Sequence, residues 1–205
     1  EGLLTVGKTG ITVVLLPRET PGLEIGKRHD PMSAAFMNGP VRGKDVFVPM
    51  EHVIGGEERT GEGWEMLMQC LSEGRGISLP AASVASAKLA CTSVGAYARV
   101  RRQFKTAIGD MEGVQVNLAR MASETYRLTA GQQLMNAMLN QHEKPAVLSA
   151  VMKYETTETA REVVTRAMDV LGGMGICKGK NNFMANTYQQ TPIGITVEGS
   201  NPLTY

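Results

Sequence analysis

Glu198 is a carboxylate that the surrounding sequence presents at a turn. It follows the mostly apolar stretch 192–197 and is followed at once by Gly199, Ser200 and Asn201, which favour chain reversal. One interpretation is structural, because carboxylates and small polar residues are favoured where a helix begins and free backbone N–H groups point outward. The other is a carboxylate held in place for chemistry, and the pattern by itself leaves both open.

Arg101 and Arg102, followed by Phe104, form a second group of interest. They come at the expected C-terminal end of a long helix, where the helix dipole favours cations, so simple capping would explain them. A guanidinium can also grip a diphosphate through paired N–H donors while a neighbouring ring covers a flat group, and a dinucleotide cofactor offers both features. The pattern is compatible with either role.

Two glycine-containing segments could contact phosphate. Gly172 and Gly173 follow a predicted helix, for which glycine is a common stop signal, so they are weak evidence alone. Residues 2–9, GLLTVGKT, match the phosphate-loop pattern of nucleotidases. That loop must be followed by a helix, whereas residues 10–17 read as a strand that ends at Pro17. Nucleotide hydrolysis is therefore the weakest alternative.

Composition excludes several classes of protein. The 205 residues are 42% hydrophobic, enough to bury a substantial core in one large or two small domains. The formal net charge of +1 gives no broad attraction to nucleic acid or anionic lipid. Three cysteines without a paired pattern fit a reducing cytosol, and they form no metal motif with the three histidines. We identify neither a signal peptide nor a transmembrane segment in the sequence.

Two kinds of periodicity divide the chain near residues 55–61. Residues 11–16 and 45–48 read as strands, each ended by proline, and predict antiparallel β structure. Helical spacing then begins with a short helix at 64–71, and three longer helices follow. The first of these carries a stripe of small side chains at Val84, Ala87, Cys91, Val94 and Ala98. The second runs from about 114 to 140, and Pro145 opens a third that ends at 171, so we predict an antiparallel bundle.

Eight short motifs resemble, in the same order, successive landmarks of the acyl-CoA dehydrogenases. They are TPGLEIG at 20–26, DVFVP at 45–49, GEGW at 61–64, EGRG at 73–76, RRQF at 101–104, VQ at 114–115, LGGMG at 171–175 and VEGS at 197–200. Each is weak alone, but together they cover nearly the whole chain. The stretch TPIGITVEG at 191–199 is similar to the large bacterial fatty-acid β-oxidation branch, the FadE type.

The resemblance implies that Glu198 is the catalytic base. In that family the Glu removes the α-proton of a fatty acyl-CoA while a hydride leaves the β-carbon for FAD, which gives trans-2-enoyl-CoA. The backbone N–H of the base is one donor to the thioester oxygen. Arg75 is similar to an arginine that lines the acyl site, and Gly199 is expected at the substrate as well. Some members carry the base at the position of Gly74, so only the displaced Glu73 could compete with Glu198.

The resemblance also implies an FAD site shared between the subunits of a homo-oligomer. Six residues are similar to positions that contact FAD in the family: Arg101, Phe104, Gln115, Gly172, Gly173 and Ser200. Among them, Arg101 resembles the arginine that reaches the FAD of a neighbouring subunit, and Gly172 and Gly173 resemble glycines that face this cofactor across the interface. The implied electron acceptor is an electron-transfer flavoprotein or a similar protein, and no metal is implied.

Compared with the family, this chain lacks the amino-terminal helical domain and the first half of the β-domain, which contacts the flavin ring. We therefore expect an incomplete α+β fold, in which residues 1–58 are the C-terminal part of the middle β-domain and residues 59–205 the C-terminal helical domain. With half of the cofactor site absent, we expect the chain alone to fold around its helices but neither to retain FAD nor to oxidise acyl-CoA.

Two expectations complete this interpretation. The parent enzyme is expected in the cytoplasm, with peripheral attachment to the inner membrane as a further option. The rival class of protein is a non-catalytic helical oligomerisation module, in which the apolar stripes serve only subunit packing. Such a module has no need for an exposed carboxylate beside Gly199 and Ser200.

Overall fold

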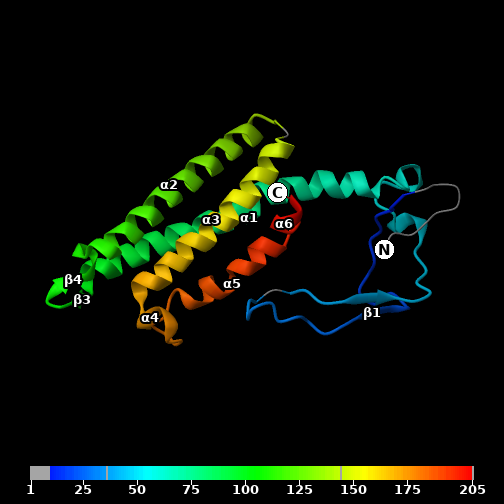
Figure 1. The fold of residues 1–205 in the computed structure, drawn as a ribbon. Helices are drawn as coiled ribbons and strands as arrows, with labels where there is room; N and C mark the ends of the chain where they lie inside the picture. Colours follow the sequence, from blue (N-terminus) through cyan, green and yellow to red (C-terminus); the bar gives the residue numbers. More distant parts are fainter. Residues whose placement is uncertain (1–9, 36, 144, 205) are drawn as a thin grey trace. The chain divides into compact units, whose positions relative to one another are not determined.

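The computed structural model describes residues 10–35, 37–143 and 145–204 (Figure 1). The chain divides into two compact units. The first contains the described residues up to Asp30 together with Ala35–Leu71, and the second contains Pro31–Ala34 and the described residues from Ser72 onward. The predicted boundary between residues 58 and 59 stays a prediction.

The first unit consists of short elements joined by turns. β1 (Leu23–Ile25) and β2 (Val41–Gly43) pair in antiparallel register, with Ile25 opposite Val41. Two 3-10 helices, η1 (Met50–His52) and η2 (Glu57–Arg59), precede the start of the first long helix. Antiparallel β structure in this part of the chain agrees with the predicted fold class.

The strands lie elsewhere than the sequence predicted. Within 11–16 only Ile11 and Val14 form single bridges, and 45–48 contains no strand. A strand is stable only where its backbone groups find a ladder of partners, and the described residues provide none for 45–48. Local β propensity therefore identified two apolar segments, of which 11–16 forms only isolated bridges and 45–48 forms none among the described residues.

The phosphate-loop match at residues 2–9 lies outside the described residues. The segment after it is described, and residues 10–17 contain no helix. Nucleotide-binding loops of this type need a helix whose N-terminus faces the phosphates. The structure thus gives no support to the nucleotidase alternative.

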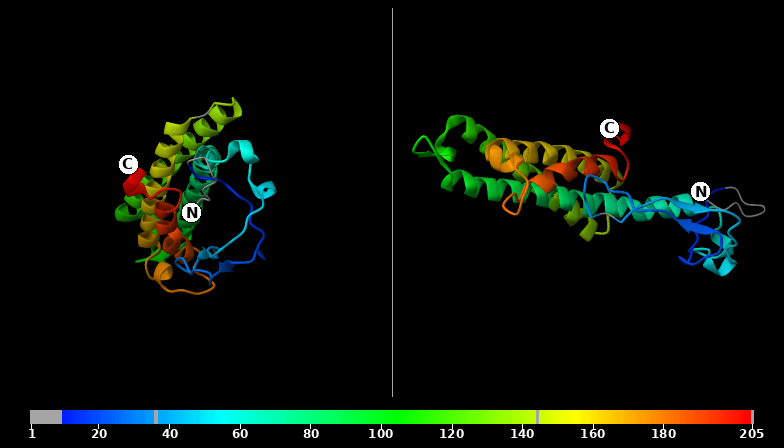
Figure 2. Two further views of the ribbon diagram at one scale, coloured as in Figure 1. Left: turned by 90° about the vertical axis from the view of Figure 1, so that its right-hand side faces the viewer. Right: turned by 90° about the horizontal axis from the view of Figure 1, so that it is seen from below.

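The second unit is a bundle of three long helices. α1 (Gly63–Val100) enters this unit at Ser72, and α2 (Glu112–Asn140) and α3 (Ala146–Leu171) follow. Figures 1 and 2 show α2 and α3 side by side along the second half of α1. This arrangement confirms the predicted antiparallel bundle, and the helix limits at 140 and 171 agree with the sequence.

Smaller elements connect the long helices and complete the bundle. A hairpin of β3 (Arg102–Gln103) and β4 (Thr106–Ala107), followed by η3 (Ile108–Asp110), connects α1 to α2. After α3, the chain forms three further helices: α4 (Gly173–Ile176), α5 (Ala185–Thr196) and α6 (Asn201–Thr204). α5 packs along α3, as Figure 1 shows, so the last segment of the chain returns beside the middle of the bundle.

Small side chains of α1 form the centre of the core. Fully buried members of the core include Val84, Ala87, Ala90, Val94 and Ala98 of α1, Met121 of α2, and Val164 and Ala167 of α3. Small residues allow helices to approach closely, and burial of this apolar surface is the main driving force for the bundle. The predicted stripe on α1 is confirmed except at Cys91, which is only half-buried; Ala90 takes the buried position beside it.

α1 joins two helices that the sequence predicted as separate. Pro80 lies inside it and is buried, although a proline removes one helical hydrogen bond. Packing compensates, because Gly76 lets the neighbouring helices come close: a Cβ there would lie 2.5 Å from Cε of Met135 and 3.2 Å from Cβ of Ser149. Tertiary contacts of this kind override local propensity.

α1 is also the one helix in the described part of the chain that is long and apolar enough to cross a membrane. The mean hydropathy of its most apolar window is 1.3. We identified no membrane-spanning segment in the sequence, so the structure differs from that prediction in this respect. Core helices of soluble proteins pass the same test, and α1 contributes Val84 and Val94 to the core of the bundle.

Candidate active site

Glu198 lies in the turn between α5 and α6. Its backbone φ is 56° and that of Gly199 is 89°, so two successive residues adopt the left-handed region. The side chain of Glu198 is exposed. Glu198 therefore does not open a helix: α5 ends at Thr196, and α6 begins only at Asn201.

Arg75 of α1 holds this turn from one side. Its guanidinium donates a hydrogen bond of 2.5 Å to the carbonyl oxygen of Glu198. The preceding residue, Gly74, also lies near the carboxylate, because a Cβ added to it would lie 4.0 Å from Oε1 of Glu198. The structure thus brings together Glu198, Gly199 and Arg75, which are remote in sequence, and places Gly74 beside the carboxylate.

Lys153 of α3 holds the same turn from inside the bundle, and sequence reasoning missed it. The side chain is 1% exposed, and its Nζ donates to Ile195 O at 3.2 Å, Gly199 O at 2.8 Å and Asn201 Oδ1 at 2.5 Å. A signal was present, since Lys153 falls on the buried helical stripe of α3 with Ser149 and Thr156. A charge on such a stripe must serve a specific partner.

Asn201 connects the lysine to the rest of α3. It is 1% exposed, accepts the hydrogen bond from Lys153, and donates to Thr157 Oγ1 at 3.0 Å and to Glu158 Oε1 at 2.9 Å. The side-chain amide is therefore satisfied on both ends, as a buried polar group requires. The sequence analysis identified Asn201 only as a turn residue.

Burial lowers the pKa of Lys153 below its ordinary value of 10.5. The Arg75 guanidinium lowers this pKa further, whereas the carboxylates of Glu198 and Glu158 raise it. Desolvation dominates because a buried ammonium loses its hydration and gains only dipolar acceptors in return.

This shift predicts a pH-dependent contribution to stability. The unfolded chain binds the proton of Lys153 more tightly than the folded chain. Its contribution to the free energy of unfolding is therefore fully present above about pH 10.5 and is lost as the pH falls through the lowered pKa. Chemical denaturation of wild-type protein and Lys153→Met at a series of pH values should show a difference that grows with pH across this window. A pH-independent difference would contradict the burial of a protonated lysine.

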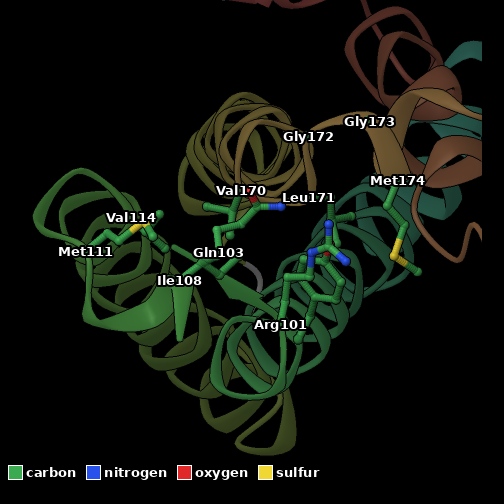
Figure 3. A pocket seen from close by; sticks show the side chains of 11 residues that line it. Arg101, Gln103, Ile108, Met111, Val114, Val170, Leu171, Gly172, Gly173 and Met174 are labelled. Carbon is green, nitrogen blue, oxygen red and sulfur yellow. The ribbon is translucent and has the colours of Figure 1, made fainter. Parts of the chain in front are cut away.

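A second site lies at the other end of the bundle. An open pocket of about 440 Å³ forms between the end of α1, the β3–η3 segment, the start of α2 and the end of α3 (Figure 3). It is lined by Tyr97, Arg101, Gln103, Ile108, Met111, Val114, Val170, Leu171, Gly172, Gly173 and Met174. Figure 3 shows the Arg101 side chain extending toward Leu171 at the end of α3. The structure therefore brings together Arg101, Gly172 and Gly173.

Three other predicted cofactor residues do not line this pocket. Phe104 sits at the tip of the β3–β4 turn with φ 50° and is 91% exposed. Gln115 is exposed in the first turn of α2, and Ser200 follows the Glu198 turn. Gln103, the last residue of β3, lines the pocket, whereas Phe104 lies in the turn that follows this strand. The assignments of Phe104, Gln115 and Ser200 stay predictions.

The pocket suits an anionic ligand with a flat, apolar part. The Arg101 guanidinium forms no ion pair with any carboxylate in the described part of the chain, and Ile108, Val170 and Leu171 supply apolar walls. A Cβ on Gly172 or Gly173 would meet no atom within 4 Å, so this side is open to a ligand. A diphosphate with an attached ring system, as in FAD, fits this donor set.

The two sites are far apart. Along α3, at about 1.5 Å per residue, Lys153 and Leu171 are separated by about 27 Å. Glu198 and the Arg101 pocket therefore do not form one continuous site in this chain.

The C-terminal part of the chain, which contains both sites, matches a known protein family. Residues 61–203 match the family model described as the C-terminal domain of acyl-CoA dehydrogenase. The chain belongs to the acyl-CoA dehydrogenase family. The matched range contains the Glu198 turn, Arg75 and Lys153, which hold this turn, and the residues that line the pocket.

Two of three matching proteins are named as acyl-CoA or butyryl-CoA dehydrogenases and agree with this assignment, whereas the name of the third, Protein HemX, does not refer to this family. The chain is 34% identical over 174 residues to the mitochondrial short-chain specific acyl-CoA dehydrogenase of Bos taurus, covering 82% of this chain and 40% of that protein. A shorter stretch of 87 residues is 54% identical to Protein HemX of Proteus mirabilis, covering 42% of this chain and 51% of that protein. Butyryl-CoA dehydrogenase of Megasphaera elsdenii superposes with a TM-score of 0.83 at 26% identity, over 95% of this chain and 50% of that one. The chain thus spans about half the length, or less, of these relatives.

Proposed function

We propose that this chain is the base-carrying part of an FAD-dependent enzyme that dehydrogenates fatty acyl-CoA to trans-2-enoyl-CoA in fatty-acid β-oxidation, in the FadE-type branch. Its class would be an oxidoreductase acting on CH–CH donors. The observation that carries the proposal is the exposed Glu198 carboxylate on a turn fixed by Arg75 and Lys153. Membership of the acyl-CoA dehydrogenase family supports the reaction class.

In the proposed reaction Glu198 removes the α-proton of the acyl thioester. The electron pair of that C–H bond forms the new double bond as a hydride leaves the β-carbon, and bound FAD supplies the acceptor for this hydride. A positioned general base contributes a factor of about 10²–10⁴ to such a step. Within the described residues the backbone N–H of Glu198 donates to no acceptor, so it is available to the thioester oxygen, on which negative charge develops.

The substrate is expected to approach along the start of the bundle. Arg75 and Gly199 flank the carboxylate, and Gly74 leaves space because its nearest heavy neighbour beyond the helix is the Glu198 carboxylate. These residues would orient the α-carbon toward Glu198. Such orientation of the reacting groups accounts for much of the rate gain from binding a substrate.

The Arg101 pocket supports a homo-oligomer with shared cofactor sites. Because the pocket lies about 27 Å along α3 from the base turn, we propose that Arg101, Gly172 and Gly173 hold the FAD of a neighbouring copy. Phe104 and Gln115, both exposed near this end, would contact the same cofactor, and Ser200 would contact the cofactor beside Glu198. The proposed electron acceptor is an electron-transfer flavoprotein or a similar protein.

The chain's cysteines support a cytoplasmic location for the parent enzyme. Peripheral attachment to the inner membrane is a further part of this proposal, to which the cysteines do not contribute. Cys70, Cys91 and Cys177 are all free thiols. Reduced thiols are typical of proteins from a reducing compartment.

Product analysis of the full-length protein tests this function. The purified flavoprotein would be incubated with butyryl-CoA or palmitoyl-CoA and an artificial electron acceptor, and mass spectrometry would follow the loss of two hydrogens. Formation of trans-2-enoyl-CoA is the expected result, and the faster substrate identifies the chain-length class. Unchanged thioesters in the presence of bound FAD would favour the helical oligomerisation module instead.

A further inference from the structure

Lys153 uses its full donor capacity on one short segment of the chain. A lysine ammonium has three N–H donors, and the acceptors are Ile195 O, Gly199 O and Asn201 Oδ1. These acceptors lie on both sides of Glu198. The lysine therefore clamps the turn before and after the carboxylate without touching the carboxylate itself.

Burial of the Lys153 ammonium costs free energy of folding, so its presence in the bundle needs an explanation. Lys153 is 1% exposed and forms no ion pair with a carboxylate within the described residues, so its charge is compensated by carbonyl and amide dipoles. Replacing buried charged groups by apolar ones of similar size is often neutral or stabilising. Stability of the bundle alone therefore gives little reason for a cation at this position.

The backbone conformation of the Glu198 turn gives a reason for a cation at position 153. Glu198 has φ 56°, a conformation that L-residues other than glycine adopt only with strain, and Gly199 follows at 89°. Such a conformation persists only when the surroundings hold it in place. Arg75 fixes the carbonyl of Glu198 from outside, and Lys153 fixes the carbonyls of Ile195 and Gly199 from inside.

We propose that Lys153 is the positioning residue of the catalytic base: its ammonium holds the Glu198 turn in the left-handed conformation that aims the carboxylate and the Glu198 N–H at the substrate. The proposal rests on the function proposed above. Asn201 is the second part of this device, because it ties the ammonium to Thr157 and Glu158 of α3. The base is thus positioned by a rigid helix and not by its own loop.

Substitution of Lys153 by Met in the full-length, FAD-loaded protein tests the proposal. Met retains the length and packing of the side chain but removes all three donors. A misplacement of the reacting groups by about 1 Å can cost about 10²-fold in rate. We therefore expect kcat with butyryl-CoA, and deuterium exchange at its α-carbon in D₂O, to fall by about 10²-fold. KM and FAD content should stay close to wild type, since Lys153 does not line the Arg101 pocket, and the variant should remain folded at the assay temperature.

Two further variants sharpen the experiment. Lys88→Met on the exposed face of α1 is the matched control and should behave as wild type. Asn201→Ala leaves Lys153 two of its three acceptors and should lower the exchange rate by a smaller factor, about 10-fold. If Lys153→Met yields no folded flavoprotein, Lys153→Gln and Asn201→Ala take its place in the same measurements.

The outcomes separate this proposal from the function on which it rests. Wild-type turnover and α-exchange in folded Lys153→Met, together with an inactive Glu198→Gln, would overturn the positioning role alone. Parallel loss of activity, FAD content and Tm would also overturn it, because Lys153 would then be only structural. Absence of dehydrogenation in the wild-type flavoprotein would overturn the proposed function itself.

Discussion

Replacing Glu198 by Gln in the full-length flavoprotein is expected to lower the turnover of acyl-CoA by about 10²-fold or more while FAD stays bound. Gln keeps the size and a polar end of the side chain but cannot accept the α-proton. We expect the cofactor to be retained, because Gln keeps the shape of the side chain and the substitution leaves Arg101, Gly172 and Gly173 of the proposed FAD contacts unchanged. Steady-state kinetics together with the flavin absorbance of the purified variant measure both effects.

Two further variants make this result specific. Glu162→Gln changes an exposed carboxylate elsewhere on α3 and should leave turnover unchanged. Gly74→Glu, added to Glu198→Gln, should restore part of the activity, because a Cβ at residue 74 would lie 4.0 Å from the original Oε1 position. Wild-type turnover in flavin-loaded Glu198→Gln would remove Glu198 from the mechanism.

Replacing Arg101 by Ala should weaken FAD binding by about 1.5–3 kcal/mol, the range for loss of a hydrogen bond to a charged group. This corresponds to about a 10- to 10²-fold increase in Kd. The reason is that Arg101 is the one arginine lining the pocket, where no carboxylate among the described residues pairs with it. Titration of the apoprotein with FAD, followed by flavin fluorescence, gives the affinity.

Arg99→Ala serves as the matched control for this prediction. Arg99 lies in the last turn of α1, two residues before Arg101, and is exposed, but it does not line the pocket. Its removal should leave the affinity for FAD near the wild-type value. Equal affinities in Arg101→Ala and Arg99→Ala would return Arg101 to a role in capping the helix.

The helical bundle could be predicted from sequence because its signals are local. The stripe on α1, the buried face of α2 and the glycine after α3 each follow from spacing along one helix. The strands could not be placed with the same success. Strand formation depends on a partner segment, and the apolar stretch 45–48 finds none in the described residues.

The candidate site likewise has a part that could be predicted from the sequence and a part that could not. Glu198 was identified from its turn and from a family resemblance, but its support was not. Arg75 and Lys153 reach the turn across 123 and 46 positions of sequence, respectively. No local pattern encodes contacts at such separations. Lys153 in particular was overlooked, since a lysine within a helix is normally solvated, and only its place on the buried stripe of α3 set it apart.

Anaerobic reduction of the flavin by substrate isolates the step in which Glu198 would remove the α-proton. The full-length protein and its Glu198→Gln variant, both loaded with FAD, would be mixed with butyryl-CoA or palmitoyl-CoA without any electron acceptor, and the flavin absorbance followed with time. We expect rapid bleaching in the wild type and bleaching slower by about 10²-fold or more in the variant. Equal bleaching in both proteins, or none in the wild type with either thioester, would contradict the assignment of Glu198 as the base of an acyl-CoA dehydrogenase.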